Sequence, residues 1–236
     1  MKPSLFRFIL AAMCLALAPH AWAGQKAEKI AVTPDGERAL VIIKAKELEP
    51  PLNMASGFHL TFAPYDAQQE AIGGSILGGG FTLLAKPKLF YDGYLVADVP
   101  PGTYAFQQFT RQDRWALCYN NNSRVFTIKA GEALYLGEFD SRGSLMDLEN
   151  EVTKSLRFTS VGGSLVHFFD VAAPRIKPVG EGEIAKVQSF VTSRMPRTTS
   201  IVQSAVFSEG RFGTGKDLFG TNRVCGGYYK GSAKPK

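Results

Sequence analysis

The sequence predicts a mainly β protein in which two sheets face each other, and three observations lead to this prediction. Apolar side chains alternate in short runs bounded by proline and glycine, a pattern typical of strands with one buried face. These runs give about seven strands before residue 140, the number found in one sandwich domain. An isolated hairpin is marginal in water, so the apolar faces of these strands need a second sheet to cover them.

The clearest runs lie in residues 91–109. Apolar side chains take alternate positions over residues 94–99, and the alternation resumes at Tyr104 and Phe106. Pro100-Pro101-Gly102 separates the two runs. Proline fixes φ for the second position of a type II turn, and glycine supplies the positive φ that the third position needs. We therefore expect the two runs to pair as a hairpin across this turn.

The remaining elements are predicted in the same way. A continuous apolar run at residues 39–45 indicates a strand buried on both faces. Further strands are predicted at residues 58–62, 81–85, 115–119, 124–128 and 133–139. The last two are expected to form a second hairpin across Ala130-Gly131.

Beyond residue 140 the pattern becomes mixed. Short alternating runs at residues 156–158, 166–168 and 201–207 continue the β character. Residues 145–150 are acidic, and a turn of helix and a linker are both compatible with them. Residues 183–191 are the best helix candidate, because Ile184, Val187 and Val191 fall on one face at helical spacing.

Two segments resemble a known family. Residues 99–104 (VPPGTY) are similar to the signature of transthyretin-like and carboxypeptidase-regulatory-like β-sandwich domains, and residues 131–139 (GEALYLGEF) are similar to a later strand of those domains. Bacterial envelope proteins of unknown function carry such domains. The resemblance implies a transthyretin-like (prealbumin-like) β-sandwich over residues 30–140, without catalytic residues. Residues 141–231 would then form a mixed extension, with one short helix, that packs on the sandwich.

The two ends of the chain are expected to lie outside the fold. Residues 1–23 have the pattern of a secretory signal peptide: basic Lys2 and Arg7, an apolar run at residues 8–18, and Ala21-Trp22-Ala23 as the cleavage signal. A retained anchor is the alternative, but the run is shorter than the roughly 20 residues that cross a bilayer. We expect export to the periplasm or cell envelope of a bacterium. Residues 232–236 are expected to form a disordered tail.

Removal of the signal peptide would change the net charge and the number of cysteines. The chain has 27 basic and 21 acidic residues, and removal of Lys2 and Arg7 leaves 25 and 21, a net charge of +4. This mild charge and the lack of a recognition motif predict no nucleic-acid partner, while association with a membrane surface or an envelope polymer stays open.

Cys118 and Cys225 are the two cysteines of the mature chain, and in an oxidising compartment they are expected to form a disulfide. Two free buried thiols are the alternative.

One group of residues could bind a ligand. Trp115, together with Tyr119, Tyr91 and Tyr94, could form a stacking platform for a sugar or a peptide. The arginines Arg111, Arg114 and Arg124 of the dense basic group, which also includes Lys129, could bind an anionic polymer. The alternative is that the tryptophan stabilises the core, as tryptophans in strands more often do. An exposed Trp115 beside the arginines would favour binding, whereas a buried indole would remove the basis for it.

Catalytic patterns are not evident. His59 and His167 have no second ligand at metal-binding spacing, and no Gly-x-Ser-x-Gly elbow occurs. We expect no catalytic, cofactor-binding or metal-binding residues. The main hypothesis is a non-catalytic exported cell-envelope protein that acts as an interaction or accessory module for an envelope protein or polymer. A glycan- or anionic-polymer-binding module is the alternative, and an envelope hydrolase is a weaker one.

Overall fold

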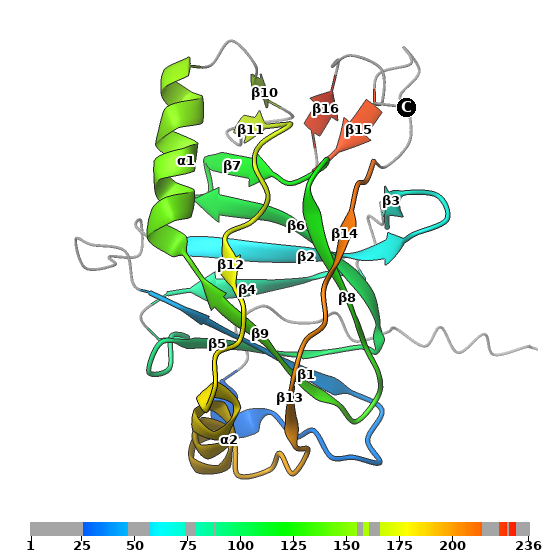
Figure 1. Ribbon diagram of the computed structural model, residues 1–236, viewed down its shortest axis with the longest axis vertical. Coiled ribbons are helices and arrows are strands. Elements are labelled where there is room, and N and C mark those ends of the chain that lie inside the picture. Colours follow the sequence, from blue (N-terminus) through cyan, green and yellow to red (C-terminus); the bar gives the residue numbers. More distant parts are fainter. Residues whose placement is uncertain are drawn as a thin grey trace, which may run out of the picture.

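The computed structural model describes residues 26–46, 57–73, 79–86, 88–154, 158–160, 166–213, 222–225 and 227–229. The predicted signal peptide and the predicted C-terminal tail lie outside these residues. The described chain is mainly β, with two α-helices, as Figure 1 shows. This confirms the predicted fold class at the level of secondary structure.

The elements follow one another in this order: η1 (Ala27–Lys29), β1 (Ala39–Ala45), β2 (Phe58–Asp66), β3 (Ala71–Ile72), β4 (Phe81–Ala85), β5 (Tyr94–Val99), β6 (Gly102–Arg111), β7 (Trp115–Cys118), β8 (Ser123–Ile128), β9 (Ala133–Phe139), α1 (Ser141–Lys154), β10 (Phe158–Ser160), β11 (Val166–Phe168), β12 (Ile176–Lys177), α2 (Glu183–Arg194), β13 (Val202–Ser204), β14 (Ser208–Gly210), β15 (Asn222–Val224) and β16 (Gly227–Tyr229). The strands predicted before residue 140 are therefore present at the predicted places.

The strands form two main sheets. In the small sheet the order is β12-β9-β1-β5, with β13 also paired to β9. In the large sheet the order is β10-β11-β7-β6-β2-β3, with β4 on β2, β8 on β6 and β14 on β8. β15 and β16 form a separate two-stranded sheet among the described strands. The short strands of the C-terminal half thus extend both sheets.

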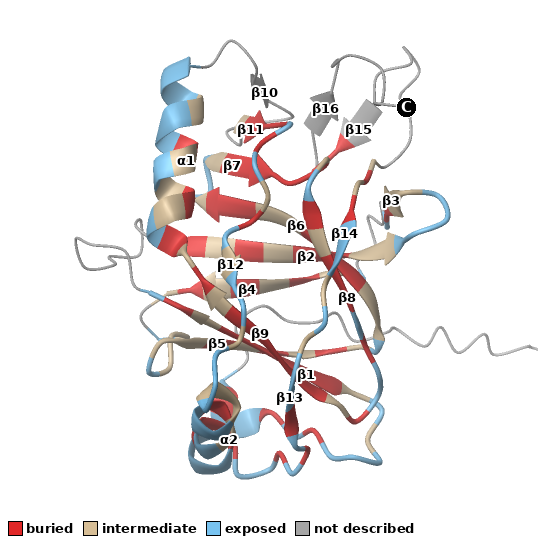
Figure 2. Cartoon of the chain, in the orientation of Figure 1, coloured by how far each residue is buried: buried red, intermediate tan, exposed pale blue. Residues whose placement is uncertain are grey.

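The inner faces of the two sheets enclose a shared aromatic core. Phe62 is fully buried and stacks on Phe81 at 4.8 Å and on Phe106 at 4.6 Å between ring centroids. Val41 and Leu95 of the small sheet belong to the same buried cluster. Figure 2 shows buried residues at alternate positions of the strands, the pattern expected when each strand turns one face inward.

Strand β1 is buried on both faces, as its continuous apolar run predicts. Val41 faces the shared core, whereas Leu40 and Ile42 belong to a second cluster on the outer face of the small sheet. Helix α2 covers that face with Val187 and Val191. The helix predicted at residues 183–191 is confirmed and continues to Arg194.

The two predicted hairpins are wrong. β5 pairs with β1 in the small sheet, whereas β6 pairs with β2, β7 and β8 in the large sheet, so the chain crosses between sheets at Pro100. Gly102 does not have the positive φ of a type II turn. Instead, the Tyr104 hydroxyl donates a hydrogen bond of 2.8 Å to the Pro100 carbonyl and braces the crossing. β8 and β9 likewise belong to different sheets, and Gly131 has a φ of 77° at their crossing.

Helix α1 corrects the expectation of a single helix. It runs over 14 residues, but only Ser141, Ser144 and Leu148 are buried, so no apolar stripe marks it in the sequence. Its first turn is held by Asp140, whose carboxylate accepts a hydrogen bond of 3.0 Å from the Gly143 amide. Capping and charge contacts, rather than hydrophobic periodicity, therefore define this helix.

Two C-terminal features fix the position of the last part of the chain. Residues 202–210, which we call the strap, contain β13 on the small sheet and β14 on the large sheet, so the strap crosses from one sheet to the other. Figure 1 shows it in orange between β9 and β8. Cys118 of β7 is bonded to Cys225 after β15, with 5.9 Å between their Cα atoms, and this confirms the predicted disulfide.

Candidate functional site

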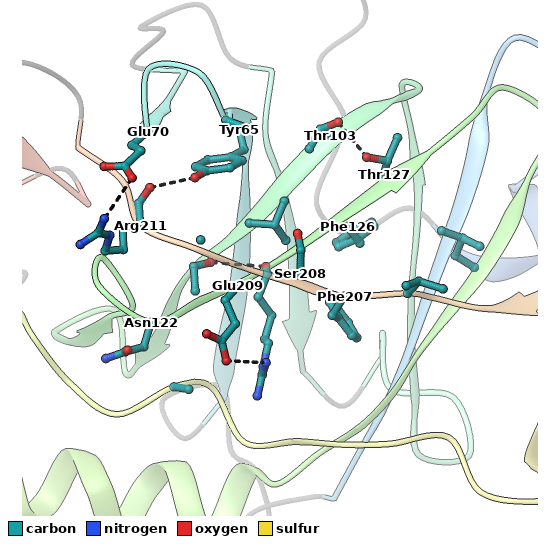
Figure 3. A pocket seen from close by; sticks show the side chains of 18 of the residues that line it. Tyr65, Glu70, Thr103, Asn122, Phe126, Thr127, Phe207, Ser208, Glu209 and Arg211 are labelled. Carbon is teal, nitrogen blue, oxygen red and sulfur yellow. Dashed lines mark hydrogen bonds and ion pairs between the residues drawn. The ribbon is translucent and has the colours of Figure 1, made fainter.

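A groove of about 1000 Å³ follows the strap on the surface of the protein. Its walls come from the strap, from β8 and from the β2–β3 hairpin, as Figure 3 shows with Ser208, Phe126 and Tyr65. Volumes near this value lie at the upper end of those of ligand pockets. We take this groove as the candidate functional site.

The strap holds its place beside the groove through alternate side chains. Phe207 points toward the core and meets Phe126 edge-on, with 6.0 Å between ring centroids. The Ala205 amide donates a hydrogen bond of 2.9 Å to the Tyr135 carbonyl of β9. Val206, between these two anchors, is 86% exposed. Because successive side chains of an extended segment point to opposite faces, Phe207 turns inward and the apolar side chain of Val206 turns outward, beside the groove.

The charges of the groove compensate one another. The part of the lining that the structure describes contains three acidic side chains (Glu70, Glu132 and Glu209) and three basic ones (Arg124, Lys129 and Arg211). Arg211 lies 3.2 Å from the Glu70 carboxylate, and Arg124 lies 3.6 Å from that of Glu209. The formal charges of the described lining residues therefore cancel, and these residues provide no excess of positive charge to attract a polyanion.

Between these ion pairs the lining is rich in hydroxyl and amide groups. The hydroxyls of Thr103 and Thr127 are 2.9 Å apart, and Gln203 and Ser204 of β13 are exposed. The Tyr65 hydroxyl donates a hydrogen bond of 3.0 Å to the Arg211 carbonyl, and burial raises the pKa of this phenol. The groove can therefore offer neutral donors and acceptors together with a small apolar surface.

Three of the predicted ligand-binding residues lie together at the β6–β7 turn. The half-buried Trp115 stacks on Phe168 at 6.2 Å, and the Arg114 guanidinium lies 5.4 Å from the centre of the indole. Arg111 pairs with Trp115 in the sheet register and donates a hydrogen bond of 3.2 Å to the Gly57 carbonyl. Desolvation lowers the pKa of the Arg111 guanidinium. The indole thus already has intramolecular contacts, and its binding of a glycan stays a prediction.

The other predicted residues lie elsewhere, and Tyr91 and Tyr94 pack against the cluster on the outer face of the small sheet. Tyr119 is buried in the shared core, which raises the pKa of its phenol, so the ring is not available to stack on a ligand. Arg124 lies on β8 beside the groove, paired with Glu209. The dense basic group of the sequence is therefore divided between two places on the large sheet.

The two histidines differ in their surroundings. His59 Nδ1 lies 3.1 Å from the Asp113 carboxylate, and desolvation lowers the pKa of the imidazole. His167 is buried, which lowers its pKa to about 4, and neither ring nitrogen has a hydrogen-bond partner among the residues that the structure describes. Among the described residues, no three histidine, cysteine or acidic side chains are grouped as metal ligands.

The fold and the groove define a two-sheet β protein with a strap-lined groove on its surface. No protein-family model, curated protein or solved structure matches the chain. Within the described ranges, no helix has both the length and the apolar character to cross a bilayer. The groove was missed at the sequence level, although residues 201–208 (IVQSAVFS) contain no charged residue and no proline, a composition unusual for an exposed segment.

Proposed function

We propose that the protein is a non-catalytic exported cell-envelope protein that acts as an interaction module, and that it binds its partner in the groove along the strap. The observation that supports this proposal is the groove itself, which combines a volume of about 1000 Å³ with neutral hydrogen-bonding groups and an exposed apolar side chain. Binding sites of this kind place a few polar groups around an apolar surface.

The proposed scaffold is a transthyretin-like sandwich. The VPPGTY segment, which carries the resemblance, lies where the chain crosses from β5 to β6, and GEALYLGEF includes all of β9. The strap pairs with β9 and β8 on one side of the two sheets. In this proposal the sandwich supplies a rigid support and the C-terminal strap supplies the binding surface.

The chemistry of the groove favours a neutral partner over an anionic polymer. Arg124 and Arg211, the two arginines among the described lining residues, each face a carboxylate. A polyanion would have to compete with Glu209 and Glu70 for these guanidinium groups. Hydroxyl and amide side chains can bind a neutral polar partner without that competition.

A photo-crosslinking experiment tests the proposal. A photoreactive amino acid is placed at Ser204, which lies in the groove, or at Ala185, which is exposed on α2 as a matched control. After incubation of the mature chain with envelope extract and irradiation, we expect one stoichiometric adduct from position 204 and none from position 185. The same products from both positions, or no product from position 204, would contradict the proposal.

A further inference from the structure

The groove has few of the anchors on which protein partners usually depend. Protein interfaces are held by a central cluster of large apolar or aromatic side chains that lose their contact with water. Among the described lining residues, Val206 is the one large apolar side chain that is mostly exposed, at 86%. Phe126 and Leu134 also line the groove, but both are buried. The groove therefore offers a protein partner little apolar surface to cover.

Exposed neutral polar side chains come instead from several parts of the lining. Figure 3 shows Asn122 in the loop before β8, Thr127 on β8 and Ser208 on β14, and all three are exposed. Gln203 and Ser204 of β13 are exposed as well. Hydroxyl and amide groups both donate and accept hydrogen bonds. A ligand that is covered with hydroxyl groups can therefore bind these side chains in many combinations.

The ion pair of Arg124 with Glu209 adds donors and acceptors without adding net charge. Arg124 Nη1 lies 3.6 Å from Glu209 Oε1, and 87% of the Glu209 side chain is exposed. A guanidinium carries five N–H donors in one plane, and a carboxylate accepts hydrogen bonds through two oxygens. Donors and acceptors therefore lie side by side at the groove, an arrangement that matches two neighbouring hydroxyl groups of a sugar ring.

The size of the groove and its apolar surface also suit a chain of sugar units. A volume of about 1000 Å³ lies at the upper end of those of ligand pockets, so the groove can hold a ligand larger than one sugar ring. Sugar rings have apolar C–H faces, which can pack on Val206 and on the half-buried rings of Tyr65 and Phe207. Because the charges of the described lining residues cancel, a neutral sugar chain suits the groove better than an acidic one.

We infer that the groove binds a neutral oligosaccharide. The inference rests on the proposed function, because it names the chemical class of the partner that the groove takes. Polar side chains of β8, β13 and β14 hydrogen-bond to the sugar hydroxyls, and Val206 contacts the C–H face of a ring. A polypeptide segment is the alternative occupant, and the test distinguishes the two.

Isothermal titration calorimetry with defined oligosaccharides tests this inference. The full mature chain is titrated with the neutral hexasaccharides cellohexaose, laminarihexaose, maltohexaose and chitohexaose, with glucose and N-acetylglucosamine, and with the acidic hexagalacturonate. We expect one or more of the neutral hexasaccharides to bind at least about tenfold more tightly than its own monosaccharide, because several units contact the groove. We expect the same hexasaccharide to bind at least about tenfold more tightly than hexagalacturonate, because the lining has no excess of positive charge.

Two variants of the protein locate the binding. Thr127→Val removes an exposed hydroxyl of β8 with little change in shape, and Gln203→Ala removes an exposed amide of β13. We expect each variant to bind the hexasaccharide about fivefold more weakly, the loss that corresponds to one hydrogen bond. Thr153→Val is the matched control, because Thr153 is exposed on α1, is not among the described lining residues and donates its hydroxyl to the Glu149 carbonyl. This control should bind as the wild type does.

The outcomes separate this inference from the proposed function. If no neutral hexasaccharide binds, or if hexagalacturonate binds equally well, the inference is wrong, and crosslinking from Ser204 then judges the groove on its own. A polypeptide adduct at Ser204 would support the proposed function and show that the occupant is a protein. If a hexasaccharide binds but both groove variants bind it as tightly as the wild type does, the sugar lies elsewhere and the inference is also wrong. An adduct at Ser204 that consists of sugar units supports both proposals.

Discussion

Loss of the Cys118–Cys225 disulfide is expected to lower the free energy of unfolding by about 5 kcal/mol. The two cysteines are 107 residues apart, and their bond joins β7 to the residue that follows β15. In the chain-entropy model, closing a loop of this length lowers the conformational entropy of the unfolded chain by about 16 cal/mol/K. At 25 °C this loss amounts to about 4.8 kcal/mol. For a protein of this size such a loss should lower the melting temperature by about 10 °C or more.

Two perturbations measure this effect independently. Reduction of the wild type with dithiothreitol keeps both sulfur atoms in place, whereas Cys118→Ala together with Cys225→Ala removes them. Thermal and urea unfolding, followed by circular dichroism, should show similar destabilisation in the two cases. The double variant should not respond to the reductant.

Two results would refute the loop-entropy argument. Unchanged unfolding midpoints after reduction would show that the bond contributes no stability. If reduction released the C-terminal segment alone, proteolytic cleavage after residue 210 would begin early while the unfolding transition of the two sheets stayed unchanged. That result would show that the loop closed by the bond does not restrict the whole chain.

Three further outcomes are expected. Phe62→Ala should lower the free energy of unfolding by about 3–5 kcal/mol in urea titrations, because it empties the centre of the aromatic core; a loss below about 1 kcal/mol would contradict the packing. Gly131→Ala should destabilise the protein more than Gly182→Ala does, because both have a positive φ but only the first would place a Cβ against the Pro34 carbonyl; equal melting temperatures would count against this contact. The free energy of unfolding should fall as the pH drops from 6.5 to about 4. In this range His167 takes up a proton in the unfolded chain but not in the folded protein, where burial lowers its pKa. An equally steep fall in the free energy of unfolding of the His167→Leu variant would exclude this imidazole as the cause.

The positions of the strands could be predicted from the sequence, because a period of two is a local property. The alternation at residues 94–99 places Leu95, Ala97 and Val99 on the buried face, as observed. The pairing of the strands could not be predicted in this way. Pro100-Pro101-Gly102 is compatible with a hairpin and with a crossing between sheets, and only the contacts of β5 with β1 and of β6 with β2 select the crossing.

Helix α1 and the groove lacked a local signal for different reasons. The helix has one buried apolar residue, Leu148, and its position depends on Asp140 and on the ion pair of Asp147 with Arg175. The groove forms where segments far apart in sequence meet, so no single motif marks it. The predicted aromatic and basic group was divided because Tyr119 takes part in the core and Arg124 faces the strap.

The position of the strap late in the sequence has a consequence for synthesis. Translation proceeds from the N-terminus, so β1 to β9 leave the ribosome well before residues 202–210. Until the strap arrives, the outer edges of β8 and β9 lack the partners β14 and β13. A nascent or prematurely terminated chain that ends before residue 201 therefore exposes two strand edges at which chains can associate with one another.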